Sequence, residues 1–331
     1  MSTRASRAPA TVALWLLAAS ALLALAGAAI GSAGWEPLWP AGGEAARAIV
    51  WEIRLPRTAG AWLAGALLGL AGAVAQGLFR NPLADPYLLG SATGAALGVA
   101  LLLVLLGVSP LAAASWWSRL GLSGAGFAGA VLAVLLTLVL AKGVQHTLRL
   151  LLAGVVVGMV FGALAALVMY WVPDVMRAMQ SFLLGTTGLI GWDGVALLAA
   201  VLAASVAVAV ALSRGLDALA LGENTAASLG VPLAPVRTLL IGVMALATGA
   251  AVAQVGLIAF VGLVAPHLAR AATRATARWL LPLSALTGGV LLLAADVLAR
   301  GLVAPQELPV GGLTAVLGGG YLLWLMHRRP L

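Results

Sequence analysis

The sequence predicts an all-α integral membrane protein with about ten transmembrane helices. Of its 331 residues, 63% are hydrophobic and only 8% are Asp, Glu, Lys or Arg. In addition, apolar runs of about 20 residues, the length that spans a bilayer, recur along the whole chain. Soluble domains carry about 25% charged residues, so a surface this poor in charge must face lipid. Soluble enzymes, nucleic-acid-binding proteins and disordered chains are therefore excluded.

Ten segments are candidate spans. They occupy residues 11–31, 58–78, 92–108, 120–141, 148–171, 194–213, 236–255, 256–268, 279–300 and 312–327. The first could alternatively be a secretory signal peptide, with Arg4 and Arg7 as its basic region. Its apolar stretch exceeds the ~7–15 residues of such a signal, which favours a helix that stays in the membrane.

The apolar run 238–269 is the hardest segment to divide. As one helix it would measure about 48 Å at ~1.5 Å per residue, which exceeds a hydrocarbon core of ~30 Å. Arg237 precedes the run and Arg270 follows it. If both arginines lie on the same side, the chain must cross and return. Glycines and Gln254 near the middle permit such a turn, so two passes, the second short, are favoured over one long helix.

The basic residues indicate the orientation. With both termini in the cytoplasm, twelve Lys and Arg fall on the cytoplasmic side and six on the outer side, as the positive-inside rule requires. The net charge of +8 reflects the same bias. No segment outside the spans is long enough to form a domain, so residues 1–331 are predicted to be a single membrane domain.

Energy-coupling chemistry is missing from the sequence. There is no Walker A loop for nucleotide phosphates, because the only lysine, Lys142, precedes Gly-Val. The chain has no cysteine and three histidines, so a metal site is not expected. Asp296 is the one acidic residue deep in an apolar segment, and pairing with Arg300 at i+4 explains it. These absences point to a transport protein that is energised by a partner.

Four ordered motifs carry a family resemblance. They are Arg54-Leu-Pro-Arg57 followed by Arg80-Asn-Pro-Leu-Ala-Asp-Pro86, then Leu221 to Val231, then Gly256 to His267, and finally Asp296, Arg300 and Glu307-Leu-Pro-Val-Gly311. Together they resemble the permease subunits of type II ABC importers, the family that imports vitamin B12, iron-siderophores and haem. The resemblance runs from about residue 50 to the end of the chain. It departs from the family pattern at Gly318-Gly-Gly-Tyr-Leu, where the family has Gly-x-Pro-x-Phe.

The resemblance implies a transport subunit without enzymatic activity in the bacterial inner membrane. Two copies would surround a central translocation pathway, and two cytoplasmic ATPase subunits would bind ATP and Mg, so no cofactor is expected on this chain. A periplasmic binding protein would deliver the ligand, and transport would proceed by alternating access. Haem permeases are the most similar, and siderophore or vitamin B12 permeases are the alternatives. The alternative of another class is a secondary transporter without an ATPase partner.

The resemblance also implies a docking site and a coupling site. Arg54, Arg57 and Arg300 lie on the predicted outer side and would pair with carboxylates of the binding protein; lipid headgroup contact, or pairing of Arg300 with Asp296, is the alternative. Segment 214–233 breaks the apolar pattern and reads as a short helix that ends at Gly230. Its residues expected to contact the ATPase are Asp217, Leu221, Gly222, Glu223, Asn224, Ala227, Leu229, Gly230 and Val231. An ordinary loop helix is the alternative.

Two further sets of residues are candidates for the pathway. Asn81 and Leu83, in a proline-punctuated loop, together with His146 and Thr147, would form a cytoplasmic gate. Gly154, Gly158 and Gly162 form a small-residue stripe along which another helix can approach closely. That stripe could line the dimer axis and pathway or pack against an ordinary neighbour. Met159, beside the stripe, offers an adaptable thioether to a large ligand.

Overall fold

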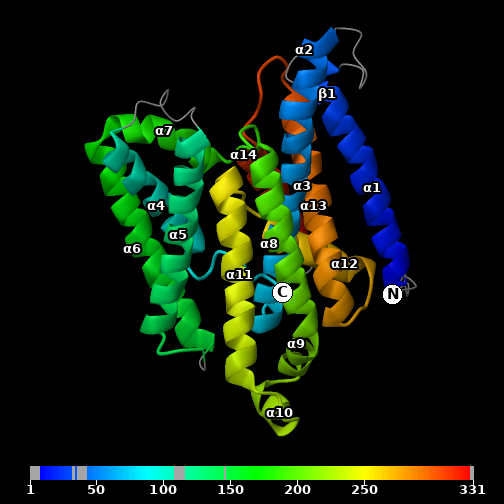
Figure 1. Cartoon of the computed structure of the whole chain (residues 1–331). Coiled ribbons are helices and arrows are strands. Elements are labelled where there is room, and N and C mark those ends of the chain that lie inside the picture. Colours follow the sequence, from blue (N-terminus) through cyan, green and yellow to red (C-terminus); the bar gives the residue numbers. More distant parts are fainter. Residues whose placement is uncertain (1–7, 32–33, 36–42, 108–115, 145–146, 329–331) are drawn as a thin grey trace.

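The computed structural model describes residues 8–31, 34–35, 43–107, 116–144 and 147–328. Its elements form a bundle of roughly parallel helices (Figure 1), and one end carries α10 while the other carries α2 and α7. The bounds are α1 Pro9–Ala29, β1 Ile30–Gly31, β2 Gly34–Trp35, α2 Gly43–Ala48, η1 Ile49–Arg54, α3 Leu55–Leu78, α4 Ser91–Leu106, α5 Trp116–Leu140, α6 Thr147–Trp171, α7 Pro173–Leu184, α8 Trp192–Ala211, α9 Ser213–Ala220, α10 Glu223–Ser228, α11 Leu233–Val255, α12 Val261–Ala272, α13 Ala277–Gly301 and α14 Val310–Arg328.

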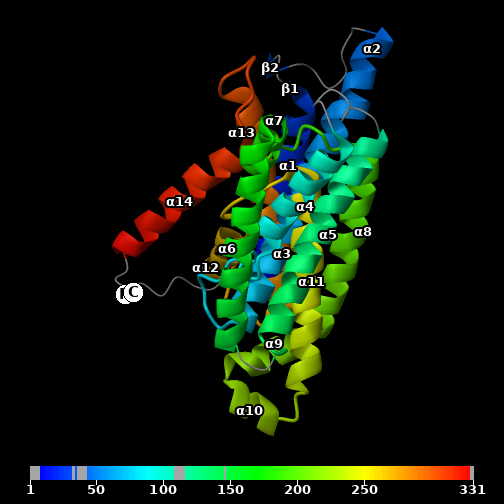
Figure 2. The same ribbon diagram turned by 90° about the vertical axis from the view of Figure 1, so that its left-hand side faces the viewer.

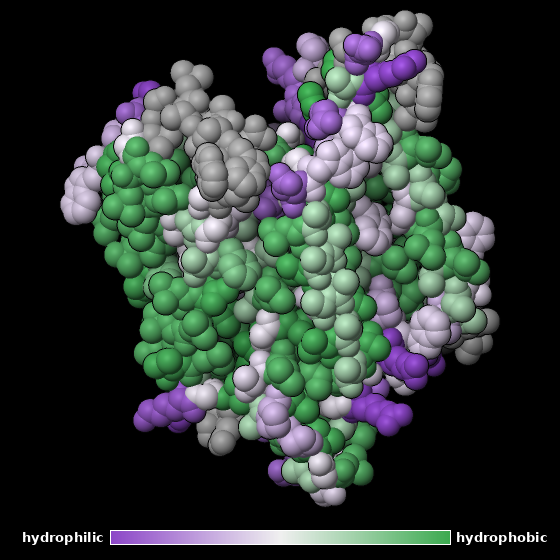
Figure 3. Space-filling model, in the orientation of Figure 1, coloured by the Kyte–Doolittle hydropathy of each residue, from purple (hydrophilic) through white to green (hydrophobic). Residues whose placement is uncertain are grey.

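Among the described residues, eight helices are long and apolar enough to cross a membrane. Helix α4, with 16 residues, and helix α12, with 12, are shorter, and with the eight they match the ten predicted spans. The surface supports this assignment, because the face seen in Figure 3 is largely apolar between two ends that carry hydrophilic side chains. The all-α membrane fold is therefore confirmed.

Helices α11 and α12 confirm the predicted double pass. Helix α11 ends at Val255, and Gly256 has a positive φ of 70°, a conformation that glycine adopts without a steric penalty. After four further residues the short helix α12 runs back to Arg270. Polar backbone at membrane depth needs partners. Here the Leu257 N–H donates to the carbonyl of Phe182 at 2.9 Å, and the Thr186 N–H donates to the carbonyl of Val255 at 2.9 Å.

Helix α3 lies at the centre of the packed core, and most of its residues are buried. It crosses α12 and α13 at glycines: a Cβ on Gly72 would overlap the carbonyl of Gly262, and one on Gly65 would overlap the carbonyl of Gly288. Such contacts let helix backbones touch directly, which is how membrane helices associate without a hydrophobic driving force. The first turns of α3 and the loop that follows the helix are thereby held in fixed positions.

Helix α14 stands apart from the rest of the bundle. It leaves the α7 end at an angle and is covered on few sides (Figure 2), and its exposed large apolar side chains are Val316, Leu317, Leu323, Trp324 and Met326. Its contact with the core accounts for Gly318, the first glycine of the C-terminal family motif: Phe260, with a φ of 67°, packs its side chain where a Cβ on Gly318 would be. Gly318 is therefore required by the ring beneath it.

Candidate docking and coupling sites

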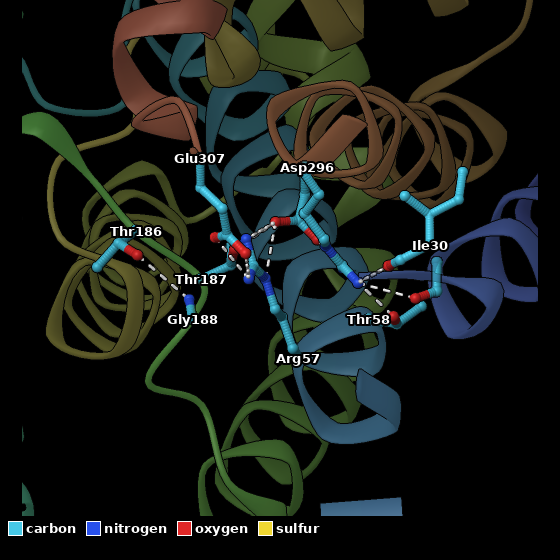
Figure 4. A network of polar contacts seen from close by, with 10 residues as sticks. Ile30, Arg57, Thr58, Thr186, Thr187, Gly188, Asp296 and Glu307 are labelled. Atoms are coloured by element: carbon cyan, nitrogen blue, oxygen red, sulfur yellow. Dashed lines mark hydrogen bonds and ion pairs between the residues drawn. The ribbon is translucent and has the colours of Figure 1, made fainter. Parts of the chain in front are cut away.

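A buried ionic network lies at the α7 end of the bundle (Figure 4). Arg57, in the first turn of α3, donates from Nε and Nη2 to Asp296 Oδ1 at 3.2 and 3.1 Å. Asp296 is fully buried on α13 and also accepts hydrogen bonds from Arg300 and from the hydroxyl of Thr187. Arg57 Nη1 lies 2.8 Å from Glu307 Oε2. A buried carboxylate needs such partners, because an unpaired charge in an apolar interior is very costly.

The network joins segments that are far apart in the sequence. Arg300 Nη1 donates to the carbonyl of Gly27 at 2.8 Å and so ties α13 to the end of α1. Thr187 belongs to the connection between α7 and α8, and Glu307 to the connection between α13 and α14. The predicted Asp296–Arg300 pair is confirmed. The roles of Thr187 and Glu307 were not predicted, although Glu307 stood inside a recognised motif.

The three docking arginines do not have the exposure that the sequence suggested. Arg54 and Arg300 are 7% and 1% exposed, and Arg54 Nη1 donates to the carbonyl of Ala29 at 3.4 Å. The expectation that these two stand open to a partner is wrong for the single chain, because nearby backbone carbonyls and Asp296 hold them inside. Arg57 is buried to the same degree, at 8% exposed, but it lines a cavity of about 380 Å³ together with Arg177, Gln180 and Glu307.

At the opposite end, α10 projects beyond the rest of the bundle (Figure 1). Gly222 and Gly230, both with positive φ, bound this short helix, as the sequence predicted. Ala226 is buried against the bundle. Of the candidate coupling residues, those that are exposed are Leu221, Asn224, Ala227, Leu229 and Gly230, whereas Gly222, Glu223 and Val231 are half-buried. The large exposed side chains of Leu221 and Leu229 give this surface an apolar character.

Glu223, the first residue of α10, connects four segments. Its Oε1 lies 2.5 Å from Arg237 Nη2 on α11 and 3.9 Å from Arg80 Nη2 after α3. Thr147, the first residue of α6, donates its hydroxyl to the same oxygen at 3.3 Å. Partial burial tends to raise the pKa of this carboxyl, but the hydrogen bond and charge of Arg237, with Thr147 and Arg80, lower the pKa below its ordinary value. Glu223 therefore faces the bundle.

Asp217 also turns inward. Its Oδ1 accepts a hydrogen bond from the Ala277 N–H at 2.9 Å, so it satisfies one of the open donors at the start of α13. Of the three polar residues expected to contact a partner, only Asn224 is exposed. The sequence could not reveal this, because Asp217 caps a helix that begins 60 residues later.

The predicted gate residues Asn81 and Leu83 lie in the loop between α3 and α4, and Thr147 is the first residue of α6. Asn81 Oδ1 accepts a hydrogen bond from the Leu83 N–H at 2.9 Å, an Asx turn that leaves Leu83 exposed. Arg80 has a positive φ of 50°, and the Asn81 N–H donates a hydrogen bond to the carbonyl of Gln76. Together these features form a Schellman-type C-terminus of α3. Thr147 contacts Glu223 as described, and His146 lies outside the described residues.

The glycine stripe of α6 packs within the chain. A Cβ on Gly154 would overlap the carbonyl of Leu88, and Gly158 and Gly162 face Thr93 of α4. Of the two alternatives, contact with an ordinary neighbour is therefore the one observed for the glycines. Met159, next to Gly158 in the helix, is 70% exposed.

Among the described residues, no group of three or more His, Cys, Asp or Glu could hold a metal ion.

Known proteins match both the sequence and this architecture. The model of the FecCD transport family matches residues 10–328. The hemin transport system permease protein HmuU of Yersinia pestis is 39% identical over 95% of each chain. The vitamin B12 import system permease protein BtuC of Salmonella typhimurium is 40% identical over 95% of each chain. A solved metal-chelate type ABC transporter in an inward-facing conformation superimposes with a TM-score of 0.84 at 28% identity, covering 97% of this chain and 100% of that one. The chain therefore belongs to the FecCD transport family and is a permease of the ABC importer class.

Proposed function

We propose that two copies of this chain form the membrane pathway for haem or another iron chelate. One observation supports this cargo more than any other: the exposed face of α6 is apolar along its length. It presents Leu152, Val155, Val156, Met159 and Val160, and no charged residue occurs between Leu150 and Trp171. A pathway lined by this face suits a flat, largely hydrocarbon macrocycle. Siderophores and vitamin B12 carry many amide and hydroxyl groups that lose hydrogen bonds on such a wall.

The cargo can be tested in proteoliposomes that contain the chain, its ATPase and its binding protein. Haem, a ferric siderophore and vitamin B12 are offered separately, and uptake and ATP hydrolysis are measured. We expect haem to give the largest stimulation of both. Uptake of vitamin B12 alone would overturn the proposal in favour of the second candidate, which the similarity to BtuC supports. Uptake that persists without the ATPase would instead indicate a secondary transporter.

The binding protein docks at the α7 end, where Arg57 offers a guanidinium to a partner carboxylate. The cavity beside Arg57 supports this, because a guanidinium donates charge-assisted hydrogen bonds to a carboxylate. Nη1, which pairs with Glu307, is the terminal nitrogen of Arg57 that is not held by Asp296. Arg54 and Arg300 do not contact the binding protein in this proposal. They position Arg57, because their hydrogen bonds fix the ends of α1 and α13 around it. Docking of this kind weakens with salt.

The ATPase pair binds the exposed surface of α10. Leu221 and Leu229 supply its apolar contacts and Asn224 a polar one, and their exposure supports the assignment. Leu229→Glu places a charge on this surface without touching the core. We expect the variant to fold but to lose its ATPase subunits during purification. For comparison, Leu239→Glu introduces the same charge at an exposed leucine within the span of α11, away from the α10 surface. Normal assembly of Leu229→Glu would contradict the coupling assignment.

A further inference from the structure

A second cavity, separate from the docking arginines, opens at the α10 end of the bundle. It has a volume of about 360 Å³ and lies among α3, α9, α12 and α13. Gln76, Arg80, Asp217, Ala220 and Arg270 contribute its polar or exposed lining. Neither the exposed face of α10 nor the α7-end network uses this space, so its function is open.

The charges of the cavity favour an anion. Arg270 donates from Nη1 to Gln76 Oε1, and its Nε and Nη2 have no partner among the described residues. The Arg80 side chain is 45% exposed, and its nearest carboxylate, on Glu223, is 3.9 Å away, beyond hydrogen-bond distance. The one carboxylate in the lining, Asp217, is directed to the N–H of Ala277. Two guanidinium groups therefore have unused donors toward the same space.

The other walls of the cavity are apolar, and its rim has the composition of a membrane interface. Leu216, Leu280, Leu281 and Ala73 line the interior. Beside the cavity, Trp279 is 45% exposed and Arg278 is exposed; tryptophan and arginine are the residues that anchor helices at the headgroup level. A free inorganic anion would gain nothing from apolar walls, whereas a lipid presents a phosphate next to hydrocarbon.

We propose that this cavity binds the phosphate of an anionic phospholipid from the leaflet at the α10 end. The donors of Arg80 and Arg270 bind the phosphate oxygens, because guanidinium groups match phosphate geometry. The apolar walls take up the glycerol and the first part of the acyl chains. Basic pockets between transmembrane helices at this depth bind anionic headgroups in the same way. The site would tie α3, α9 and α12 to the membrane surface next to α10, whichever cargo is carried.

Ala220 permits a test that leaves both arginines intact. It lines the cavity at the end of α9 and is exposed, so Ala220→Glu brings a negative charge into the cavity, and Ala220→Gln adds the same volume without charge. The full-length chain in neutral detergent is titrated with dioctanoyl phosphatidylglycerol, with dioctanoyl phosphatidylcholine and with inorganic phosphate. Retained lipid is counted by native mass spectrometry, and thermal unfolding shows that each variant is folded.

We expect the wild-type chain and Ala220→Gln to retain phosphatidylglycerol but not phosphatidylcholine, and Ala220→Glu to bind it about tenfold more weakly because like charges repel. Equal binding of phosphatidylglycerol by both variants would overturn the proposal. Displacement of the lipid by millimolar inorganic phosphate would also overturn it, because the site would then be one for a free anion. If Ala220→Glu fails to fold, Arg80→Gln replaces it, and Arg149→Gln, an exposed arginine outside the cavity lining, is its matched control.

Discussion

The hydroxyl of Thr147 donates a hydrogen bond to the carboxylate of Glu223, with 3.3 Å between Oγ1 and Oε1. This contact joins the first residue of α6 to the first residue of α10, and Arg237 binds the same carboxylate from α11. A displacement of α10 therefore reaches the start of α6 directly, without passing along the whole of α8 or α11. In the proposed mechanism, Glu223 is the point at which the ATPase acts on the helices of the pathway.

Glu223→Gln tests this connection. The amide keeps the shape of the side chain but loses the charge that Arg237 and Arg80 neutralise, and hydrogen bonds to charged groups contribute about 1.5–3 kcal/mol. We expect transport per ATP hydrolysed to fall on the order of tenfold, while the complex still assembles. Thr147→Val, which removes only the link to α6, should lower the same ratio less. An unchanged ratio in Glu223→Gln would show that coupling does not pass through this carboxylate.

The pH dependence of the same group has a definite sign. The pKa of Glu223 is lowered in the folded protein, so its stabilising contribution is complete above the ordinary value of 4.5 and disappears as pH falls through the folded value. Thermal unfolding of the wild type and Glu223→Gln is compared from pH 8 to acid. The difference in unfolding temperature should stay constant down to about pH 5 and shrink below it. A difference that vanishes near neutral pH would contradict this assignment.

Asp296→Asn should destabilise the chain strongly. Asp296 is fully buried and accepts hydrogen bonds from Arg57 and Arg300, so the variant leaves two buried guanidinium groups without their carboxylate. Breaking a buried ion pair in this way costs about 3–5 kcal/mol. The exposed pair of Asp174 and Arg177 provides the control, because Asp174→Asn should cost about 0–1 kcal/mol. Unfolding in detergent measures both, and equal effects would show that the network contributes little.

Gly72→Ala should separate α3 from α12. A methyl group at Gly72 has no room, since it would overlap the backbone carbonyl of Gly262, which cannot rotate away as a side chain could. Overpacking usually costs about 1–3 kcal/mol, and a backbone contact should reach or exceed the upper end of that range. Gly242→Ala on α11 meets open space and should be neutral or stabilising by about 0.5–1 kcal/mol. Similar stability of the two variants would contradict the close packing of α3.

Glu307→Gln should strengthen docking of the binding protein. The Glu307 carboxylate lies 2.8 Å from Arg57 Nη1 at the cavity and competes with a carboxylate that approaches from outside. Removing the charge releases Arg57 Nη1 to pair with the partner, while Nε and Nη2 stay on Asp296, so the affinity should rise several-fold and the salt dependence should steepen. Arg177→Gln, on the same cavity but in an exposed surface pair, should change the affinity less. An unchanged affinity in Glu307→Gln would exclude Arg57 as a docking residue.

The sequence determined the membrane class, the spans and the local turns of this protein. Lipid exposure sets the composition of each span independently of its neighbours, and Gly222 and Gly230 bound α10 through local backbone preferences. The double pass of α11 and α12 followed from the length of the apolar run, which would overshoot the bilayer as one helix, and from the arginines at its two ends. The ordered motifs also identified the family correctly.

Only the tertiary structure decided how the few polar residues are used. Arg57 and Asp296 are 239 positions apart, and no sequence periodicity predicts such a pair. Arg54, Arg57 and Arg300, which the sequence suggested were exposed, are buried. Asp217 and Glu223 turned inward to partners on other helices. The physical reason is common to all of them: in a chain with so few charges, each buried charge requires a specific partner, and the packing of distant helices selects it.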